Sequence, residues 1–151
     1  MIKVMFLCHG NICRSPMAEF VFKYISKEYK NKLLIQSKAV SSEEIGNPIY
    51  PPAKLKLKEK GIPFDDHHAS RITKQDYIDF DYIIVMEQCN IPRLMNIIGE
   101  DTDNKVYRLL DFTQKTGDIE DPWYSGDFEK VYNQIFDGCN GLLKHLIKEG
   151  L

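Results

Sequence analysis

The chain has 151 residues and a formal net charge of −2 at pH 7. A chain of this length buries roughly two-thirds of its unfolded surface in one core, so we expect a single domain over residues 1–151. The small net charge gives no electrostatic case for a nucleic-acid or membrane partner. No apolar run reaches the roughly 18 residues of a transmembrane helix, and the short apolar N-terminus lacks a signal-peptide cleavage site. We therefore expect a cytoplasmic protein.

Strands and helices are predicted to alternate along the chain. Residues 2–7 are apolar on both faces apart from Lys3, which is typical of a central parallel strand. A helix is expected to follow from Pro16, with an apolar face up to residue 25. Further strands are predicted at 33–40, 82–86 and 106–110, and further helices at 53–60, from Thr73, at 91–98 and at 128–147. This alternation predicts a parallel sheet covered on both faces.

The last helix has the clearest pattern, because its apolar positions keep helical spacing over about five turns. Gly138 and Gly141 interrupt this stripe. Each glycine is expected to weaken the helix by about 1 kcal/mol relative to alanine.

The four cysteines show no zinc-ligand spacing, and nothing else in the chain suggests a secreted protein. Reduced thiols are therefore expected, and no metal site. Cys89 and Cys139 are expected to pack, the latter on the apolar stripe of the last helix.

The segment Cys8-His9-Gly10-Asn11-Ile12-Cys13-Arg14-Ser15-Pro16 joins the first strand to the first helix. Ligands of parallel sheets bind beyond the carboxyl ends of strands, where such a loop can point its N–H groups at an anion. The helix that follows adds its own N–H groups and dipole. Gly10 and Asn11 tolerate a positive φ, and the guanidinium of Arg14 matches two phosphate oxygens.

A thiol at the bottom of such a loop is stabilised as the thiolate by the same field, which makes Cys8 a candidate nucleophile. Ser15 could donate a hydrogen bond to the sulfur. The alternative is a buried structural cysteine beside a turn, with Arg14 on the surface. The buried strand before the loop and the Ser-Pro helix start after it favour the phosphate site. The predicted loop comprises His9, Gly10, Asn11, Ile12, Cys13, Arg14 and Ser15.

A second motif, Asp121-Pro122-Trp123-Tyr124, lies late in the chain. A general acid on a loop stiffened by proline could approach the phosphate loop, and two aromatic side chains could flank a flat ring. Alternatively, Asp121 forms a turn before proline and the two aromatic residues only pack.

These two motifs, in this order, resemble those of the low-molecular-weight protein tyrosine phosphatases, and 81–86 resembles that family's third strand. The resemblance spans nearly the whole chain. It implies a single α/β domain with a four-stranded parallel sheet in the order 2-1-3-4 and helices on both faces. It also implies hydrolysis of protein phosphotyrosine or small aryl phosphates, with inorganic phosphate as product and no cofactor.

The family's mechanism implies a role for each matched residue. Cys8 would form a phosphocysteine while Asp121 protonates the leaving phenolate and later activates water. Arg14 would hold the phosphate oxygens. By analogy Asn11, Ser15, Ser37 and His67 would support the loop, with the alignment favouring His67 over His68. His9 occupies a variable position and is expected to point away from phosphate.

Two features concern substrate choice and oxidation. Glu43 and Glu44 stand where the family usually has an aromatic or apolar rim residue, and we expect them, like Trp123 and Tyr124, to flank the substrate. The two carboxylates would disfavour acidic neighbours of the phosphotyrosine; alternatively, both only solvate a loop. Cys13 occupies the position that the family uses for a protective disulfide with the nucleophile, here Cys8.

Two other functions remain possible for such a loop. A thioredoxin-coupled arsenate reductase has a similar fold and loop but needs two further cysteines on one flexible segment, and Cys89 and Cys139 lie about 50 residues apart. A non-catalytic phosphate-binding or phosphocarrier module would have no use for both Arg14 and Asp121.

Overall fold

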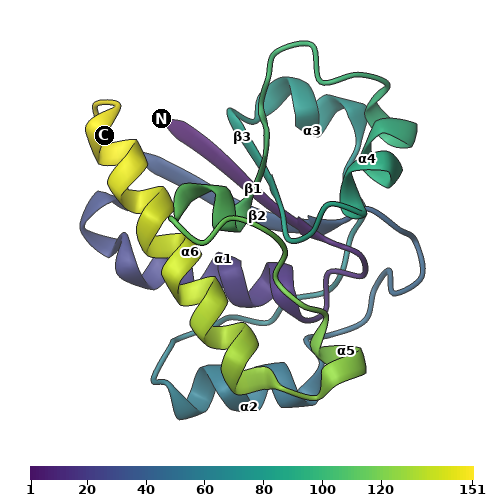
Figure 1. Ribbon diagram of the computed structural model, residues 1–151, viewed down its shortest axis with the longest axis vertical. Helices are drawn as coiled ribbons and strands as arrows, with labels where there is room; N and C mark the ends of the chain where they lie inside the picture. The colour runs from purple at the N-terminus through teal and green to yellow at the C-terminus, as the bar shows by residue number, and fades with distance from the viewer.

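Four parallel strands form the middle layer of the computed structural model, which describes residues 1–151 (Figure 1). The strands are hydrogen-bonded in the order β2-β1-β3-β4. Every pair is parallel, so all four strands end at the same edge of the sheet. The predicted fold class and strand order are confirmed. The strands are β1 (Ile2–Cys8), β2 (Leu33–Ala39), β3 (Tyr82–Val85) and β4 (Val106–Arg108).

Helices cover both faces of this sheet, as predicted (Figure 1). One face carries α1 (Arg14–Ile25) and α6 (Phe128–Lys148), and the other carries α3 (Lys74–Asp79) and α4 (Asn90–Ile98). The helix α2 (Pro51–Glu59) packs against α1 and α6, and the four-residue helix α5 (Pro122–Ser125) lies beside it (Figure 1). Two 3-10 turns complete the structure, η1 (Lys27–Tyr29) and η2 (Leu109–Phe112). None of the helices combines the length and hydropathy needed to cross a bilayer.

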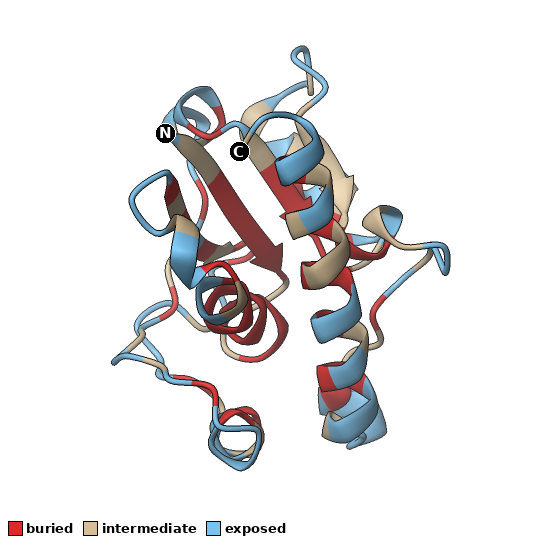
Figure 2. Ribbon diagram, turned by 90° about the vertical axis from the view of Figure 1, so that its left-hand side faces the viewer, coloured by how far each residue is buried: buried red, intermediate tan, exposed pale blue.

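The central strand β1 separates two hydrophobic cores. Val4 and Phe6 point into the larger core, under α1 and α6, whereas Met5 and Leu7 point into the smaller core, under α3 and α4. All four side chains are fully buried, and Figure 2 shows the strand as a continuous buried band. Side chains of a strand alternate between faces, so an apolar run on both faces requires this central position. Packing from both sides fixes the end of β1, where Cys8 lies.

The fourth strand is shorter than predicted, because it ends at Arg108 instead of residue 110. Leu109 and Leu110 belong to η2 and are buried against α6. Glycines on α6 allow this approach: a Cβ at Gly138 would lie 2.5 Å from Cγ of Leu109, and one at Gly141 would collide with a backbone carbonyl of η2. The two glycines that were expected only to weaken α6 therefore make room for η2.

Other element boundaries are close to the predicted ones. The helix α2 begins at Pro51, two residues earlier than predicted, because proline fits the first turn of a helix. The predicted cap at Thr73 is confirmed: its side chain accepts from the N–H of Asp76, whose carboxylate accepts in return from the N–H of Thr73.

Candidate active site

The loop after β1 wraps around the sulfur of Cys8. The backbone N–H of Asn11 donates to Cys8 Sγ at 3.3 Å, and Ser15 Oγ lies 3.0 Å from the same atom. Asn11 adopts a left-handed conformation with φ of 60°, as predicted, but Gly10 does not. Gly10 is instead placed close to Glu44, whose Cγ would lie 3.1 Å from an added Cβ. The helix α1 begins at Arg14, so Ser15, which contacts the sulfur, lies in its first turn.

The side chain of Asn11 holds this loop in shape. It is fully buried, and its amide group donates to Ser15 Oγ at 2.8 Å and to Ser37 Oγ at 3.0 Å. Its carbonyl oxygen accepts from the N–H of Ser70 at 3.3 Å and lies 3.1 Å from Nε2 of His67. The structure therefore brings together all four residues that were predicted to support the loop. Their hydrogen bonds to Asn11 offset the conformational free-energy cost of its left-handed backbone.

Behind this network lies a buried carboxylate that the sequence analysis missed. Ser37 Oγ donates to Glu19 at 2.6 Å, and Glu19 also accepts from Lys23 one helical turn further along α1, at 2.6 Å. Nδ1 of His67 lies 3.9 Å from the same carboxylate. The i, i+4 spacing of Glu19 and Lys23 was visible in the sequence, but its contact with β2 depends on the tertiary fold.

Arg14 is 2 % exposed and is held by groups from two distant segments. Its Nη1 donates to the backbone carbonyl of Ile119 at 2.9 Å, and its Nη2 donates to Glu87 at 3.1 Å. Burial opposes the charged form, but Cys8, Glu87 and Asp121 outweigh it and raise the pKa of Arg14. The guanidinium therefore stays charged and its plane is fixed. Glu87 was also missed, although it lies just beyond the carboxyl end of β3, where site residues of parallel sheets are found.

Asp121 caps the N-terminus of α5. Its Oδ1 accepts from the N–H of Trp123 at 3.0 Å, and its Oδ2 lies 3.5 Å from Nη2 of Arg14. The two motifs, separated by about a hundred residues in the chain, therefore meet at the guanidinium. This arrangement places the carboxyl group of Asp121 in the lining of the same cavity as the thiol.

A cavity of about 580 Å³ opens over Cys8. At its mouth Nε2 of His9 lies 2.9 Å from Glu43. Trp123 and Tyr124 are 57 % and 86 % exposed. The predicted flanking residues all line this cavity, whereas, apart from Cys8-loop neighbours, Asn11, Ser15, Ser37 and His67 are not among its lining residues. The lining residues are Cys8, His9, Gly10, Ile12, Cys13, Arg14, Glu43, Glu44, Glu87, Cys89, Asn90, Arg93, Asp121, Trp123 and Tyr124.

The four cysteines are free thiols in different surroundings. Burial, together with Cys8 and Asp121, raises the pKa of the Cys13 thiol, and burial alone raises the pKa of Cys139. Cys139 is buried as expected, but the expectation that Cys89 packs is wrong, because Cys89 is exposed in the lining of the cavity over Cys8. Partial desolvation and Glu87 raise the pKa of its thiol. Among the four, Cys8 alone combines a contact to a hydroxyl group with one to a backbone N–H.

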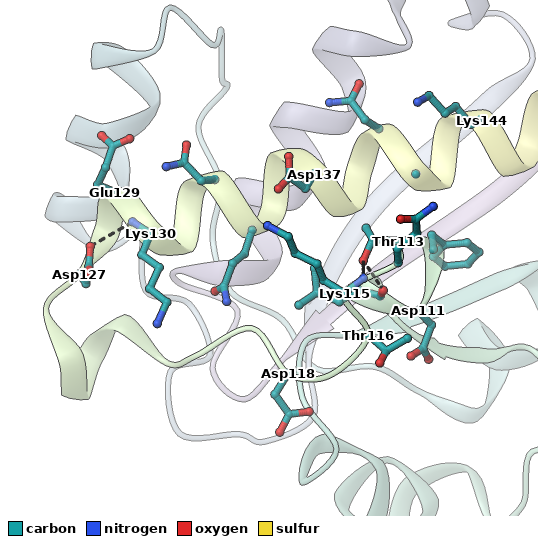
Figure 3. A pocket seen from close by; sticks show the side chains of 17 residues that line it. Asp111, Thr113, Lys115, Thr116, Asp118, Asp127, Glu129, Lys130, Asp137 and Lys144 are labelled. Carbon is teal, nitrogen blue, oxygen red and sulfur yellow. Dashed lines mark hydrogen bonds between the residues drawn. The ribbon is translucent and has the colours of Figure 1, made fainter.

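A larger groove of about 1170 Å³ runs between α6 and residues 110–118 (Figure 3). Its labelled side chains carry mixed charge, from Asp111, Asp118 and Asp137 to Lys115 and Lys144. No cysteine or histidine lines it, and no group of three His, Cys, Asp or Glu side chains in the chain could hold a metal ion. The cavity over Cys8 is therefore the candidate active site.

Comparisons with known proteins point to one family. Residues 3–150 match the family model described as low molecular weight phosphotyrosine protein phosphatase. The chain is 40 % identical to the low molecular weight protein-tyrosine-phosphatase YfkJ of Bacillus subtilis, over 99 % of this chain and 98 % of that protein. It is 32 % identical to PtpA of Staphylococcus aureus, which bears the same description, over 99 % of this chain and 96 % of that protein.

Solved structures share the whole fold. The crystal structure of YfkJ matches with a TM-score of 0.95 at 39 % identity, covering 100 % of this chain and 98 % of that one. A Drosophila protein described as an arginine phosphatase matches with a TM-score of 0.85 at 30 % identity, over 96 % and 98 % of the two chains. With the family model matched from end to end, the chain belongs to the low molecular weight phosphotyrosine protein phosphatase family.

Proposed function

We propose that the protein hydrolyses phosphotyrosine in proteins, and small aryl phosphates, through a phosphocysteine on Cys8. One observation carries this proposal: a cysteine thiol that accepts from a loop N–H shares one cavity with Arg14 and with Asp121, a carboxyl group from a separate segment that lies 3.5 Å from the guanidinium. Phosphate bound by Arg14 and the loop N–H groups would have Cys8 on one side and Asp121 on the other, which suits in-line transfer.

In the first step the thiolate of Cys8 forms a bond to phosphorus as the bond from phosphorus to the phenolic oxygen breaks. Asp121 gives its proton to that oxygen, so the phenol leaves neutral. The hydroxyl group of Ser15, 3.0 Å from the sulfur, stabilises the thiolate before attack. Arg14 and the loop N–H groups stabilise the charge on the three phosphoryl oxygens.

In the second step water attacks the phosphorus of the phosphocysteine. Asp121, now a carboxylate, takes a proton from that water, the bond between sulfur and phosphorus breaks, and inorganic phosphate leaves. Ser15 stabilises the sulfur as it departs. Asn11, Ser37 and His67 touch neither substrate nor nucleophile through their side chains and act by holding the loop.

The aromatic side chains at the mouth support an aryl substrate. Trp123 and Tyr124 line the cavity next to Asp121, where they can flank the ring of a phosphotyrosine. Because a relative of the same fold is described as an arginine phosphatase, a phosphoarginine peptide is the informative competitor. We expect a higher kcat/KM for the phosphotyrosine peptide of the same sequence.

Rapid-quench kinetics with 4-nitrophenyl phosphate test the mechanism. Wild type should release a burst of 4-nitrophenol and carry phosphate on Cys8, and Cys8→Ser should lose the burst. Asp121→Ala should slow formation of the intermediate by about 10² to 10⁴-fold for poor leaving groups. A wild type without a burst that still binds phosphate would support a binding module, and arsenate-dependent thiol oxidation would support the arsenate reductase alternative.

Glu43 and Glu44 supply negative charge at the mouth and support a preference against acidic flanking residues. Replacing both by glutamine should raise kcat/KM for an acidic phosphopeptide by a few-fold at low salt and leave a neutral peptide unchanged. An unaltered ratio between the two peptides would contradict this preference.

Oxidation is proposed to join Cys8 to Cys13. Both thiols are buried in the same loop, and a neighbouring thiol captures a sulfenic acid before it is oxidised further. Wild type treated with peroxide should therefore regain activity with added thiol, whereas Cys13→Ser should regain less. Equal recovery of the two proteins would refute the disulfide.

A further inference from the structure

Tyr50 lies outside the cavity but contacts both segments that carry the proposed catalytic groups. Its backbone N–H donates to the carbonyl oxygen of Ile12, in the loop after β1, at 2.8 Å. Its ring packs against Trp123, with 4.9 Å between the ring centroids, and against Phe128 at 6.1 Å. Tyr50 therefore joins the cysteine loop to the segment that begins at Asp121.

Trp123 in turn sets the orientation of Asp121. The N–H of Trp123 is the donor to Oδ1, which leaves Oδ2 as the oxygen 3.5 Å from Arg14. Oδ1 is thus held by the backbone of α5, and Oδ2 is the oxygen left to give the proton that the proposed mechanism requires. A shift of the backbone at Trp123 would therefore turn the proton away from the leaving oxygen.

Few contacts hold Trp123 in place. The helix α5 has four residues and ends at Gly126, which has a left-handed φ of 71°. Trp123 is 57 % exposed, and Tyr50 is the one aromatic ring that packs against it. Phe128, the second ring that contacts Tyr50, begins α6 and packs against the larger core. A continuous line of contacts thus runs from the core through Tyr50 and Trp123 to the acid.

We propose that Tyr50 is a positioning residue for the general acid. Its ring holds Trp123, and through the N–H of Trp123 it fixes the carboxyl group of Asp121 over the cysteine loop. This inference rests on the proposed function, in which Asp121 gives a proton to the leaving oxygen. Tyr50 itself touches neither the thiol nor the phosphate.

Leaving-group dependence provides the test, since a general acid matters most when the leaving phenol is weakly acidic. We would measure kcat/KM for a series of aryl phosphates. Tyr50→Ala should lose about tenfold on phenyl phosphate and stay within about threefold of wild type on 4-nitrophenyl phosphate. Asp121→Ala should show a steeper dependence still, and adding Tyr50→Ala to it should cause no further loss.

Two control variants distinguish loss of the aromatic ring at position 50 from general disruption of this segment. Tyr50→Phe keeps the ring and should keep the wild-type dependence on leaving group. Leu55→Ala, at a 65 % exposed position of α2 on the same segment, should leave it unchanged. Trp123 is the one tryptophan of the chain, so tryptophan fluorescence reports on it directly. In Tyr50→Ala its emission maximum should move to longer wavelength and acrylamide should quench it more strongly, and neither change should occur in Tyr50→Phe.

An equal loss on every substrate, or an unchanged leaving-group dependence in Tyr50→Ala, would overturn the inference while leaving the proposed function intact. A wild type that forms no phosphocysteine and does not turn over 4-nitrophenyl phosphate would overturn the function itself. Inhibition by inorganic phosphate should be the same in Tyr50→Ala and wild type, which checks that the cysteine loop is intact. If Tyr50→Ala does not fold, Tyr50→Leu, which keeps apolar volume without the ring, should show the same selective loss.

Discussion

Arg14 owes its orientation to groups that no local pattern contains. The spacing from Cys8 to Arg14 predicts a phosphate loop, because loop, helix start and guanidinium are consecutive in the chain. The partners of the guanidinium, Glu87 and the carbonyl of Ile119, come from beyond β3 and from the segment before α5. The sequence therefore identifies the residues that would bind phosphate. The contacts that orient the guanidinium of Arg14 form only in the tertiary fold.

Replacing Arg14 by lysine should reduce kcat/KM by about 10² to 10³-fold, even though the charge is retained. An ammonium group lacks the planar fork that spans two phosphate oxygens while bonding to Ile119 and Glu87. Steady-state kinetics with an aryl phosphate measure this loss. Arg71→Lys, at an exposed position, is the matched control; a loss of similar size there would show that the fork geometry of Arg14 is not the cause.

Iodoacetamide at neutral pH should label Cys8 ahead of the other thiols. Burial raises the pKa of Cys13 and of Cys139, so both remain protonated, and alkylation requires the thiolate. Peptide mass spectrometry after limited labelling gives the order, and inorganic phosphate should protect Cys8. Labelling of Cys13 before Cys8 would contradict the distinction between the two loop thiols.

Among the elements, β1 and α6 follow from their sequence pattern, and η2 does not. An apolar run on both faces requires a central strand, and a long apolar stripe requires a packed helix. Leu109 and Leu110 extend the apolar run of β4 and were therefore assigned to that strand. They leave it because burial against α6 competes with strand pairing at the edge of the sheet, and that choice depends on Gly138 and Gly141 far along the chain.

Gly141→Ala should lower the free energy of unfolding by about 1 to 3 kcal/mol, although alanine favours helices. The added methyl group would meet the backbone carbonyl of Phe112, which cannot move without displacing η2. Gly138→Ala should cost less, since its neighbour is the side chain of Leu109. Urea unfolding measures both, with exposed Asn133→Ala as the control. A higher free energy of unfolding in Gly141→Ala would show that η2 can shift to accommodate the methyl group without loss of stability.

For the whole molecule, bound phosphate should raise the melting temperature. Binding to the folded state alone contributes about 2.7 kcal/mol at a hundredfold excess over Kd, which corresponds to roughly 5 to 10 °C for a chain of this size. Cys8→Ser should keep this shift and Arg14→Lys should lose most of it. Sodium chloride at equal ionic strength is the control in scanning fluorimetry; an equal shift with chloride would mean that no specific phosphate site exists.

The hydrogen bond between Arg14 and Ile119 spans 105 residues of chain, and this span sets the order in which activity appears during folding. The thiol loop, β1 and β2 lie within the first 40 residues, so a growing chain can pair them early. The buried guanidinium gains its carbonyl partner only when the segment before α5 has docked. In refolding experiments, catalytic activity should therefore return after the far-ultraviolet circular dichroism signal. A nascent chain should likewise stay inactive until its last third has emerged from the ribosome.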